Sequence, residues 1–372
     1  MKDKKENIIL FGGSFDPIHN GHIRLAKAAS RMLGGKVFFI PAKAPRWKHP
    51  SASPNDREKM IKAALNEIND PSLCFSDIEL KRVGETTYTI DTVKEFKNLY
   101  PDSNLILLIG GDSVNTFDKW KDAEEISRLT RIVYIERDDT LVNEDNALRF
   151  KMEKLYYTGA GPVSSSGIRD LRTMDTPLSV IDYIEKNNLY FINNVRALLS
   201  HERFIHSLSV AHLSYDIALS NQFMNPDMAY IAGLLHDIGK NVEEKKSRML
   251  IEKNDPEYKD LPRYCLHQFV GEYYAKEKFG IENPLVLDAI KYHCTGKEHM
   301  PPLSKIIYAA DKIEPTRGYD SSALIKKCKI NYYHGFLEVL KHNKKFIDSK
   351  PNPGEKNKLS NQCFKSYLRS YK

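Results

Sequence analysis

The amino-acid sequence predicts two domains of different fold class: an α/β domain built on a doubly wound parallel sheet, followed by an all-helical domain. Apolar runs at residues 8–11 and 105–109 each end at a glycine pair, as buried parallel strands do before a tight turn. Runs of this kind stop after about Tyr190, and only helical spacing continues. A chain of 372 residues is also too long for one comfortable core.

The first half alternates strands with helices. Residues 20–33 have helical spacing of apolar positions, and residues 37–40 and 132–135 form two more buried strands. This alternation favours a doubly wound sheet, in which ligands bind at the carboxyl ends of the strands. The pairs Gly12-Gly13 and Gly110-Gly111 both fall at such ends. We therefore expect a ligand site there.

The second half contains only helical patterns. The expected helices cover residues 204–220, 227–240, 269–278, 284–293 and 303–313. Asn225-Pro226 suits the start of the second helix, because asparagine caps helices and proline fits the first helical position. We place the domains at residues 1–194 and 195–349. The basic segment 350–372 contains Pro351 and Pro353, and we expect it to be loosely ordered.

The amino-acid composition limits the kinds of partner that we expect for this protein. A net charge of +7, from 56 basic and 49 acidic residues, suits nucleotide ligands, but no nucleic-acid motif accompanies it. We therefore expect no nucleic-acid partner. Five cysteines without CxxC spacing suit a reducing compartment. No signal-peptide core or membrane-spanning run is evident, so we expect a cytoplasmic protein without a membrane partner. The sequence leaves the oligomeric state open, a homo-oligomer included.

The segment GGSFDPIHNGH, residues 12–22, has the features of a nucleotide site. Glycines after a strand let the backbone approach a phosphate closely. His19 and His22 lie three residues apart at a predicted helix start, where exposed N–H groups and the positive helix end favour an anion. A phosphate that attacks the α-phosphate of ATP needs alignment and charge stabilisation rather than a protein nucleophile. The segment therefore predicts nucleotidyl transfer.

Over about residues 7–191 the sequence resembles the bacterial nicotinate-mononucleotide adenylyltransferases (NadD type) of the HxGH nucleotidyltransferase superfamily, which have a Rossmann-like fold. The shared motifs are GGSFDPIHNGH, PAKAPRWK, TYTIDT, IGGDS, DKW and VSSSGIR. The resemblance implies catalytic roles for His19, His22, Lys48 and Arg169. It implies nucleotide or substrate binding by Gly12, Gly13, Ser14, Thr87, Tyr88, Gly110, Asp112, Trp120, Ser164 and Ser165. The departures are small: Ser14 replaces threonine, Gly111 replaces alanine, and Trp47 stands where histidine often precedes the lysine.

The resemblance implies that the first half transfers an adenylyl group from ATP to nicotinate mononucleotide, giving nicotinate adenine dinucleotide and pyrophosphate in NAD biosynthesis. Magnesium would accompany ATP, held mostly by the phosphates. Backbone N–H groups near Thr87 and Tyr88 would read the pyridine carboxylate, and Trp120 would stack on the ring. The alternative is another HxGH transferase, acting on phosphopantetheine or choline phosphate; TYTIDT and Trp120 argue against it.

A second set of residues has metal-ligand chemistry. His236 and Asp237 are adjacent in GLLHDIGK, so on a helix their side chains diverge by about 100° and can share one cluster only at the helix end. The other candidate ligands are His206, His267, His293 and Asp311. Four histidines and two aspartates make a full set for two metals bridged by a carboxylate, a centre suited to attack on phosphorus.

This order of ligands resembles the HD-domain metallophosphohydrolases, and over about residues 199–340 it resembles the YqeK type, which splits diadenosine tetraphosphate symmetrically into two ADP. HCTGKEHM and IIYAADKIEPTRGY carry the likeness. The resemblance implies two divalent transition metals, iron in this family, with Asp237 and Lys240 in catalysis and Arg317 on the substrate phosphates. Gln268 departs from the glycine that commonly follows the third histidine, and it would narrow the metal pocket.

Two alternatives stay open for the second half. One is a different nucleotide phosphohydrolase, acting on (p)ppGpp or a mononucleotide. The other is a non-catalytic module that senses nucleotide and regulates the first half, although a sensor has no need of all six ligands. The sequence thus predicts a bifunctional enzyme that uses ATP, nicotinate mononucleotide and dinucleoside polyphosphates.

Overall fold

The computed structural model describes residues 5–44, 50–82, 87–136, 141–159, 161–223, 225–349 and 357–368. The chain divides into two compact units. The first comprises Met1–Arg169 with Asp175–Tyr190, and the second comprises Asp170–Met174 with Phe191–Lys372.

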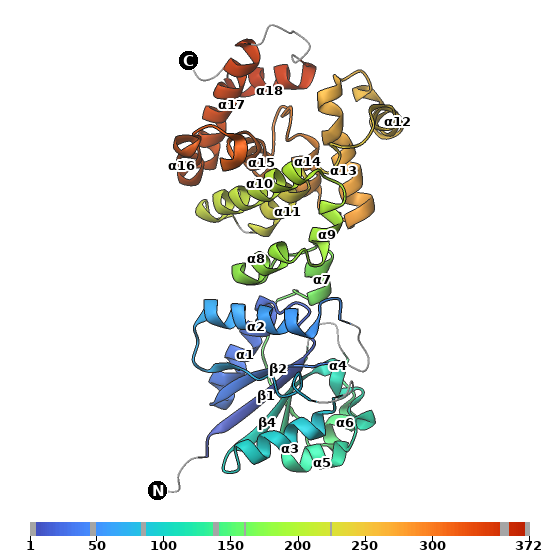
Figure 1. Ribbon diagram of the computed structural model, residues 1–372, viewed down its shortest axis with the longest axis vertical. Coiled ribbons are helices and arrows are strands. Elements are labelled where there is room, and N and C mark those ends of the chain that lie inside the picture. The colour runs from blue at the N-terminus through green and yellow to red at the C-terminus, as the bar shows by residue number, and fades with distance from the viewer. Residues whose placement is uncertain are drawn as a thin grey trace. The chain divides into compact units, whose positions relative to one another are not determined.

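The first unit is built on a parallel sheet. Its described residues form six strands in the order β3-β2-β1-β4-β5-β6, and every neighbouring pair is parallel (Figure 1). The strands are β1 (Asn7–Gly13), β2 (Lys36–Pro41), β3 (Leu73–Phe75), β4 (Asn104–Gly110), β5 (Arg131–Ile135) and β6 (Glu153–Lys154). The predicted doubly wound α/β class is confirmed. The four predicted strands are present, while β3 and β6 were missed because two or three residues carry no pattern.

Helices cover both faces of this sheet (Figure 1). The helices in the described part of the first unit are α1 (Asn20–Leu33), α2 (Pro54–Ile68), α3 (Thr89–Leu99), α4 (Gly111–Val114), α5 (Ala123–Leu129), α6 (Glu144–Arg149), α7 (Ser165–Arg169) and α8 (Leu178–Lys186), with a 3₁₀ turn at Phe117–Lys119. Alternate residues of β1, Ile8 and Leu10, pack in one core with Val93 and Phe96 of α3 and Ile126 of α5. Helices α1 and α2 lie on the opposite face.

Strand order explains where a ligand can bind. The chain leaves β1 toward β2 on one side and returns to β4 on the other, so the order reverses between β1 and β4. Such a switch point opens a crevice at the carboxyl ends of the strands. The glycine pairs at the ends of β1 and β4 lie at these carboxyl ends. A Cβ added to Gly12 would meet no atom within 4 Å.

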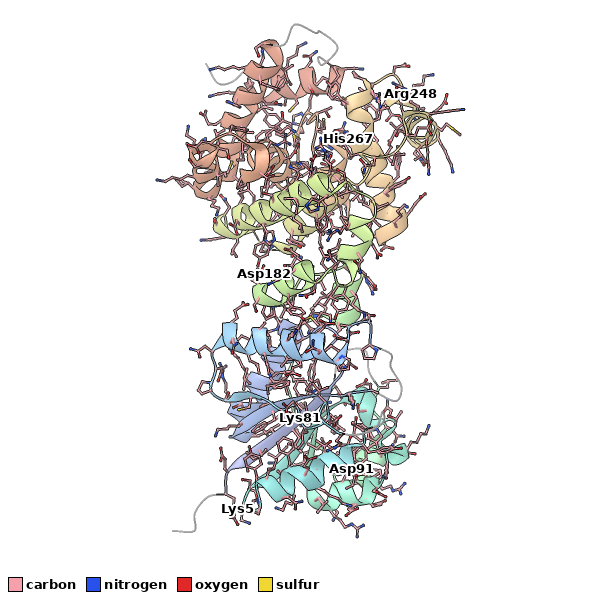
Figure 2. All side chains as sticks on the ribbon, viewed as in Figure 1. Lys5, Lys81, Asp91, Asp182, Arg248 and His267 are labelled. Atoms are coloured by element: carbon pink, nitrogen blue, oxygen red, sulfur yellow. The ribbon has the colours of Figure 1, made fainter. Side chains whose placement is uncertain are left out.

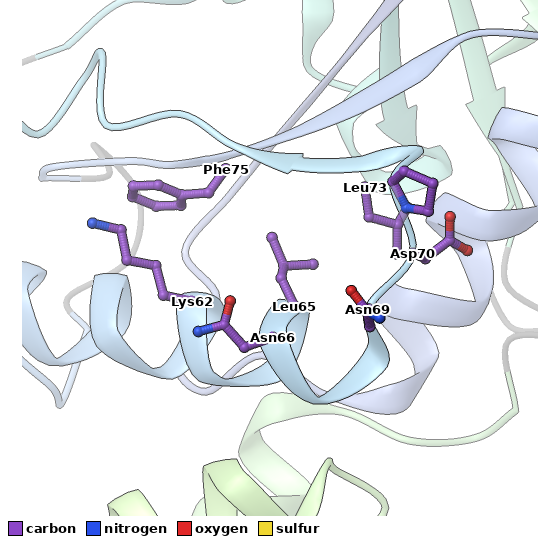
Figure 3. Close-up of a pocket in the computed structure, with 8 residues that line it drawn as sticks. Lys62, Leu65, Asn66, Asn69, Asp70, Leu73 and Phe75 are labelled. Carbon is purple, nitrogen blue, oxygen red and sulfur yellow. The ribbon is translucent and has the colours of Figure 1, made fainter.

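A hollow of about 580 Å³ lies at the edge of the sheet, between α2 and β3 (Figure 3). Lys62, Leu65 and Asn66 line it from α2, and Leu73 and Phe75 line it from β3. The ammonium of Lys62 lies 4.8 Å from the centre of the Phe75 ring. None of the predicted site residues that the structure describes lines this hollow, so it is separate from the proposed chemistry.

The described part of the second unit is helical. Its helices are α9 (Phe191–Arg196), α10 (His201–Ser220), α11 (Asp227–Leu235), α12 (Glu244–Asn254), α13 (Leu266–Phe279), α14 (Pro284–Lys291), α15 (Pro302–Ile313), α16 (Ser322–Ile330), α17 (Tyr332–Ser349) and α18 (Lys358–Leu368), with 3₁₀ turns at Pro256–Tyr258, Arg263–Cys265 and Pro315–Arg317. This confirms the all-helical class. Ser200 and Asn283 cap α10 and α14 by accepting backbone N–H groups of the first turn. In the described residues no helix is both long and apolar enough to cross a membrane.

Two parts of the second unit differ clearly from expectation. Helix α11 ends at Leu235 rather than Lys240, because the chain then tightens into turns in which Lys240 N–H donates to the carbonyl of Asp237. Residues 358–368, which the sequence analysis expected to be loosely ordered, form α18. Its apolar residues are spaced for one helical face: Leu359 joins one buried cluster, and Cys363 and Phe364 join another.

Helix α18 therefore contributes to stability. Phe364→Ala should lower the free energy of unfolding of the second unit by about 3 kcal/mol, because it leaves a cavity beside Phe336 and Leu340. For a unit of this size this is a drop of roughly 6–12 °C in its thermal transition, measured by calorimetry. Lys365→Ala, on the exposed face of the same helix, is the control and should change it little. Equal effects of the two changes would contradict a packed α18.

Candidate active sites

His19 and His22 form the amino end of α1. His19 is the N-cap, and its Nδ1 accepts the backbone N–H of His22 at 3.3 Å. His22 Nδ1 in turn accepts the backbone N–H of His19 at 3.3 Å, so the two residues make a reciprocal capping box. Their rings stack with centroids 3.6 Å apart, and the Phe15 ring lies edge-on to His22 at 5.0 Å.

These hydrogen bonds decide the tautomer of both rings. A neutral imidazole whose Nδ1 accepts a hydrogen bond carries its proton on Nε2. His19 and His22 therefore each have an Nε2–H group with which to donate to an anion. A helix start is already electropositive, so both rings suit a phosphate.

The turn between β1 and α1 is hydrogen-bonded to side chains of α7. Ser165 Oγ donates to the carbonyl of Pro17 at 2.8 Å, and Arg169 Nη1 donates to the carbonyl of Asp16 at 2.6 Å. Ser164 Oγ accepts the backbone N–H of Gly167 at 3.0 Å. The structure thus brings Ser165 and Arg169 against the turn that leads to His19, although these segments are far apart in sequence. Lys48 lies outside the described residues.

Tyr88, which follows Thr87, and Trp120 lie on the face of the sheet that α3 and α5 cover. Tyr88 is the N-cap of α3, and Thr87 Oγ1 donates to Glu79 Oε2 at 2.8 Å. Tyr88 and Trp120 pack against the same buried cluster, in which the Trp120 ring lies 5.0 Å from that of Phe117. Gly110 and Asp112 lie where β4 ends and α4 begins. Trp120 is only partly buried, so one part of the indole remains accessible.

The six candidate metal ligands come from five places in the second unit. His206 lies in α10, His236 and Asp237 directly follow α11, His267 lies in α13, His293 follows α14, and Asp311 lies in α15. All six are buried. Figure 2 shows His267 among the interior side chains of this helical unit.

The ligand atoms form two groups that share Asp237. His206, His236 and Asp237 offer atoms within 4.8 Å of one another, and so do Asp237, His267 and His293. Asp237 Oδ1 lies 3.3 Å from His267 Nε2 and 3.6 Å from His293 Nε2, whereas Oδ2 lies 3.8 Å from His236 Nε2. Asp311 Oδ1 joins the first group at 3.2 Å from His206 Nε2. One carboxylate therefore faces two histidine pairs.

The Nδ1 atoms of three of these histidines have acceptors. His236 Nδ1 lies 2.7 Å from the carbonyl of Gly233, and His293 Nδ1 lies 2.7 Å from that of Ile290. A carbonyl only accepts, so both Nδ1 atoms are protonated and both Nε2 atoms carry a lone pair. His206 Nδ1 similarly donates to Glu314 Oε1 at 2.8 Å. Such partners orient histidines that bind metals.

The buried carboxylates of Asp237, Asp311 and Glu314 attract positive charge. Burial lowers the pKa of His236 to about 3, so its ring is neutral at pH 7. Burial by itself would lower the pKa of His206, but hydrogen bonds to Asp311 and Glu314 raise it to about 9. Burial would raise the pKa of Asp237, yet the neighbouring imidazoles hold it well below its usual range. Imidazole lone pairs and carboxylates at these distances fit a divalent transition metal.

Cations surround the cluster. Arg317 Nη2 pairs with Asp311 Oδ1, and Lys240 Nζ lies 3.5 Å from both ring nitrogens of His267. Arg203 Nη1 lies 3.1 Å from Asp237 Oδ2, and its side chain is 41% exposed. Sequence reasoning missed Arg203 and Glu314. Their signal was only their spacing: each lies three residues from a candidate ligand, His206 and Asp311 respectively.

Gln268 has a structural partner in the metal-binding region. Its side chain is fully buried, donates to Thr295 Oγ1 at 3.1 Å and accepts Thr295 N–H at 3.2 Å. Gln268 follows His267 and Thr295 lies two residues after His293, so the pair ties together two segments that bear candidate ligands. The His267 and His293 Nε2 atoms are 3.1 Å apart.

Two regions of the chain match family models. Residues 10–171 match the model described as cytidylyltransferase-like, and residues 203–316 match that of the HD domain. The probable nicotinate-nucleotide adenylyltransferase/Ap4A hydrolase of Mycoplasma genitalium is 33% identical over 348 residues, which cover 91% of this chain and 98% of its own. The chain belongs to this adenylyltransferase/hydrolase family. The Mycoplasma pneumoniae member of the same name is 30% identical over 344 residues, covering 90% and 98%.

One solved structure is similar to part of the present chain. It is a predicted HD superfamily hydrolase involved in NAD metabolism from Clostridium acetobutylicum, 30% identical, which covers 48% of this chain and 95% of its own with a TM-score of 0.43.

Gly239 lies in close contact with the backbone of α13, the helix that carries His267. A Cβ at Gly239 would lie 2.4 Å from the carbonyl oxygen of His267 and 2.7 Å from the backbone nitrogen of Gly271. Backbone atoms of α13 would have to move, taking His267 away from Asp237. Gly239→Ala should therefore lose bound metal, measured by elemental analysis, and lower the thermal transition of the second unit.

The control for this prediction is Gly280→Ala. A Cβ there meets no atom within 4 Å, but the residue has a φ of +63°, so the change should cost about 1 kcal/mol and keep the metal. Wild-type metal content in Gly239→Ala would mean that the contact does not position the ligands.

Proposed function

We propose that the protein is a bifunctional enzyme that joins nicotinate mononucleotide to the adenylyl group of ATP and hydrolyses diadenosine tetraphosphate to two ADP. The observation that carries this proposal is a match of at least 30% identity across 98% of two relatives named for both activities. The arrangement of the candidate site residues in each unit supports it independently. We place both reactions in the cytoplasm, where ATP is available.

The first reaction needs donors around the triphosphate. An oxygen of the mononucleotide phosphate attacks the α-phosphorus of ATP, the bond from that phosphorus to the bridging oxygen breaks, and pyrophosphate leaves. The Nε2–H groups of His19 and His22 would stabilise the charge that develops at the α-phosphate. Arg169, Lys48 and the serines Ser164 and Ser165 would hold phosphate oxygens. Gly12, Gly13 and Ser14 would allow close approach, and Mg²⁺ would enter with ATP.

Recognition of the acceptor falls to Thr87, Tyr88 and Trp120 of the first unit. Backbone N–H groups at the start of α3, beside Thr87 and Tyr88, would donate to the pyridine carboxylate and would find no acceptor in a carboxamide nitrogen. The accessible part of Trp120 would stack on the pyridine ring. Gly110 and Asp112, at the end of β4, would contact the adenosine.

The second reaction would take place at the buried cluster. Two divalent metals would be held there, and the resemblance to the family implies iron. Asp237 belongs to both groups of ligand atoms, and the full set of ligands would be His206, His236, His267, His293, Asp237 and Asp311. Metal ions there would supply Lewis acidity to a phosphate oxygen and make a bound water more acidic. Lys240 and Arg317 would bind the remaining phosphates and neutralise the leaving ADP.

The most direct experiment is to incubate the purified protein with diadenosine tetraphosphate and several divalent metals, and to identify the products. Two ADP would support the proposed cleavage at the central bridging oxygen, whereas ATP with AMP would indicate asymmetric cleavage. Absence of turnover with every metal, while adenylyl transfer proceeds, would favour the nucleotide-sensing alternative. Hydrolysis only of (p)ppGpp or mononucleotides would favour the other alternative.

The proposed role of His22 in transfer can be tested separately from its hydrogen bond to the N-cap His19. His22→Ala should lower adenylyl transfer by about 100-fold or more, because a preorganised donor to the reacting phosphate is worth about 3 kcal/mol. His22→Asn keeps a side-chain acceptor for the backbone N–H of His19 but removes Nε2, and it should lose as much activity. Pyrophosphate release measures transfer, and hydrolysis by the same preparation is the control. Wild-type transfer in His22→Asn would leave His22 only a capping role.

Asp237 tests the metal centre and the independence of the two activities. Asp237→Ala should lose at least one metal and nearly all hydrolysis of diadenosine tetraphosphate, because the carboxylate is the member that both histidine groups share. Elemental analysis and both assays are made on one preparation. Asp216→Ala removes an exposed carboxylate of α10 and should change none of these values.

Two outcomes would contradict this prediction. Retention of both metals with normal hydrolysis would place the second site elsewhere. Loss of adenylyl transfer in a folded Asp237→Ala protein would mean that the two activities are coupled.

A further inference from the structure

We propose that Arg57 and Asp16 are positioning residues for adenylyl transfer: the buried guanidinium and carboxylate hold the β1–α1 turn, the segment after β2 and Arg169 in one arrangement. This inference rests on the proposed function of the first unit. Neither side chain is assigned to contact the substrate.

The burial of Arg57 is the first observation. Arg57 lies in the first turns of α2, a helix that begins after the cap Ser53 with Pro54 in its first position. Its side chain is fully buried, and it is the largest such side chain among the described residues. A buried charge is costly unless it has partners. Burial lowers the pKa of Arg57, while Asp16 and Tyr190 act in the opposite direction.

The hydrogen bonds of Arg57 go to two backbone segments. Nη1 donates to the carbonyl of Ser14 at 2.8 Å, and Nη2 donates to the carbonyl of Lys43 at 3.1 Å. Ser14 belongs to the turn that leads to His19. Lys43 lies two residues after the end of β2. The rigid fork of a guanidinium therefore fixes the distance between the ends of two neighbouring strands.

Asp16 holds the same turn from the other side. Its carboxylate accepts the backbone N–H groups of Ser51 and Ala52 at 2.8 and 3.0 Å, and the hydroxyl of Tyr190 at 2.8 Å. Arg169 Nη1 donates to the Asp16 carbonyl at 2.6 Å and lies 3.6 Å from Oδ2. Three segments that are distant in sequence thus meet at one aspartate.

These contacts bear on catalysis because phosphate-binding groups must be placed accurately. A misplacement of about 1 Å costs about 100-fold in rate. His19 and His22 follow the turn that Asp16 and Arg57 hold, and Arg169 is bound to it directly. A purely structural role would instead change folding stability and leave the turnover of folded enzyme unchanged.

The test compares variants of Arg57 at a temperature well below their thermal transitions. In Arg57→Met, kcat for nicotinate adenine dinucleotide formation should fall about 100-fold, whereas KM for either substrate should rise by no more than about tenfold. Arg57→Lys restores the charge and part of the hydrogen bonding, and should recover at least tenfold in kcat. Arg131→Met removes a paired arginine at the opposite end of the sheet and should leave kcat unchanged.

Tyr190→Phe provides a second variant if Arg57→Met does not fold. It removes one hydroxyl that donates to Asp16 and should lower kcat several-fold while the equilibrium Kd for ATP stays within about twofold. Wild-type kcat in a folded Arg57→Met, or in Tyr190→Phe where Arg57→Met fails to fold, would overturn the inference. A wild-type protein that forms no dinucleotide would instead overturn the proposed function, so the two failures are distinguishable.

Discussion

The chemistry of both sites depends on which partner the Nδ1 atom of each histidine has. At His19 and His22 this nitrogen accepts a backbone N–H, so Nε2 carries the proton and can donate to a phosphate. At His236 and His293 it donates to a backbone carbonyl, so Nε2 presents a lone pair to a cation. One residue type thereby presents a hydrogen-bond donor in the first unit and a lone pair in the second.

The helix ends supply these partners. An α-helix leaves N–H groups unsatisfied at its amino end and carbonyls unsatisfied at its carboxyl end. His19 and His22 lie at the amino end of α1, whereas His236 and His293 follow the carboxyl ends of α11 and α14. The end of the helix at which a histidine lies therefore sets its tautomer. The same ends place a positive dipole near the proposed phosphates and a negative one near the proposed metals.

The sequence predicted those features that local patterns encode. The strands ending at Gly13 and Gly110 and the switch to helices after Tyr190 have such signals. The grouping of His206, His236, His267 and His293 was predicted instead from their ligand chemistry and their order along the chain. Arg57, Arg203 and Glu314 were not predicted, because a single charged residue in or beside a helical pattern is usually exposed, and only tertiary packing makes these three partners of site residues. Short β3 and β6 exist because neighbouring strands pair with them.

Helix α18 has a consequence for the order in which the protein folds during synthesis. Everything the first unit needs, including β1, β4 and the Tyr190 hydroxyl on Asp16, has been translated by residue 190. The clusters of the second unit are complete only when Leu359, Cys363 and Phe364 arrive. At about 5–20 residues per second the ribosome takes roughly 9–35 s to cover that interval. For that time the first unit is complete while the apolar helices of the second lack their last partner, so the apolar surface that α18 will cover stays exposed on the nascent chain.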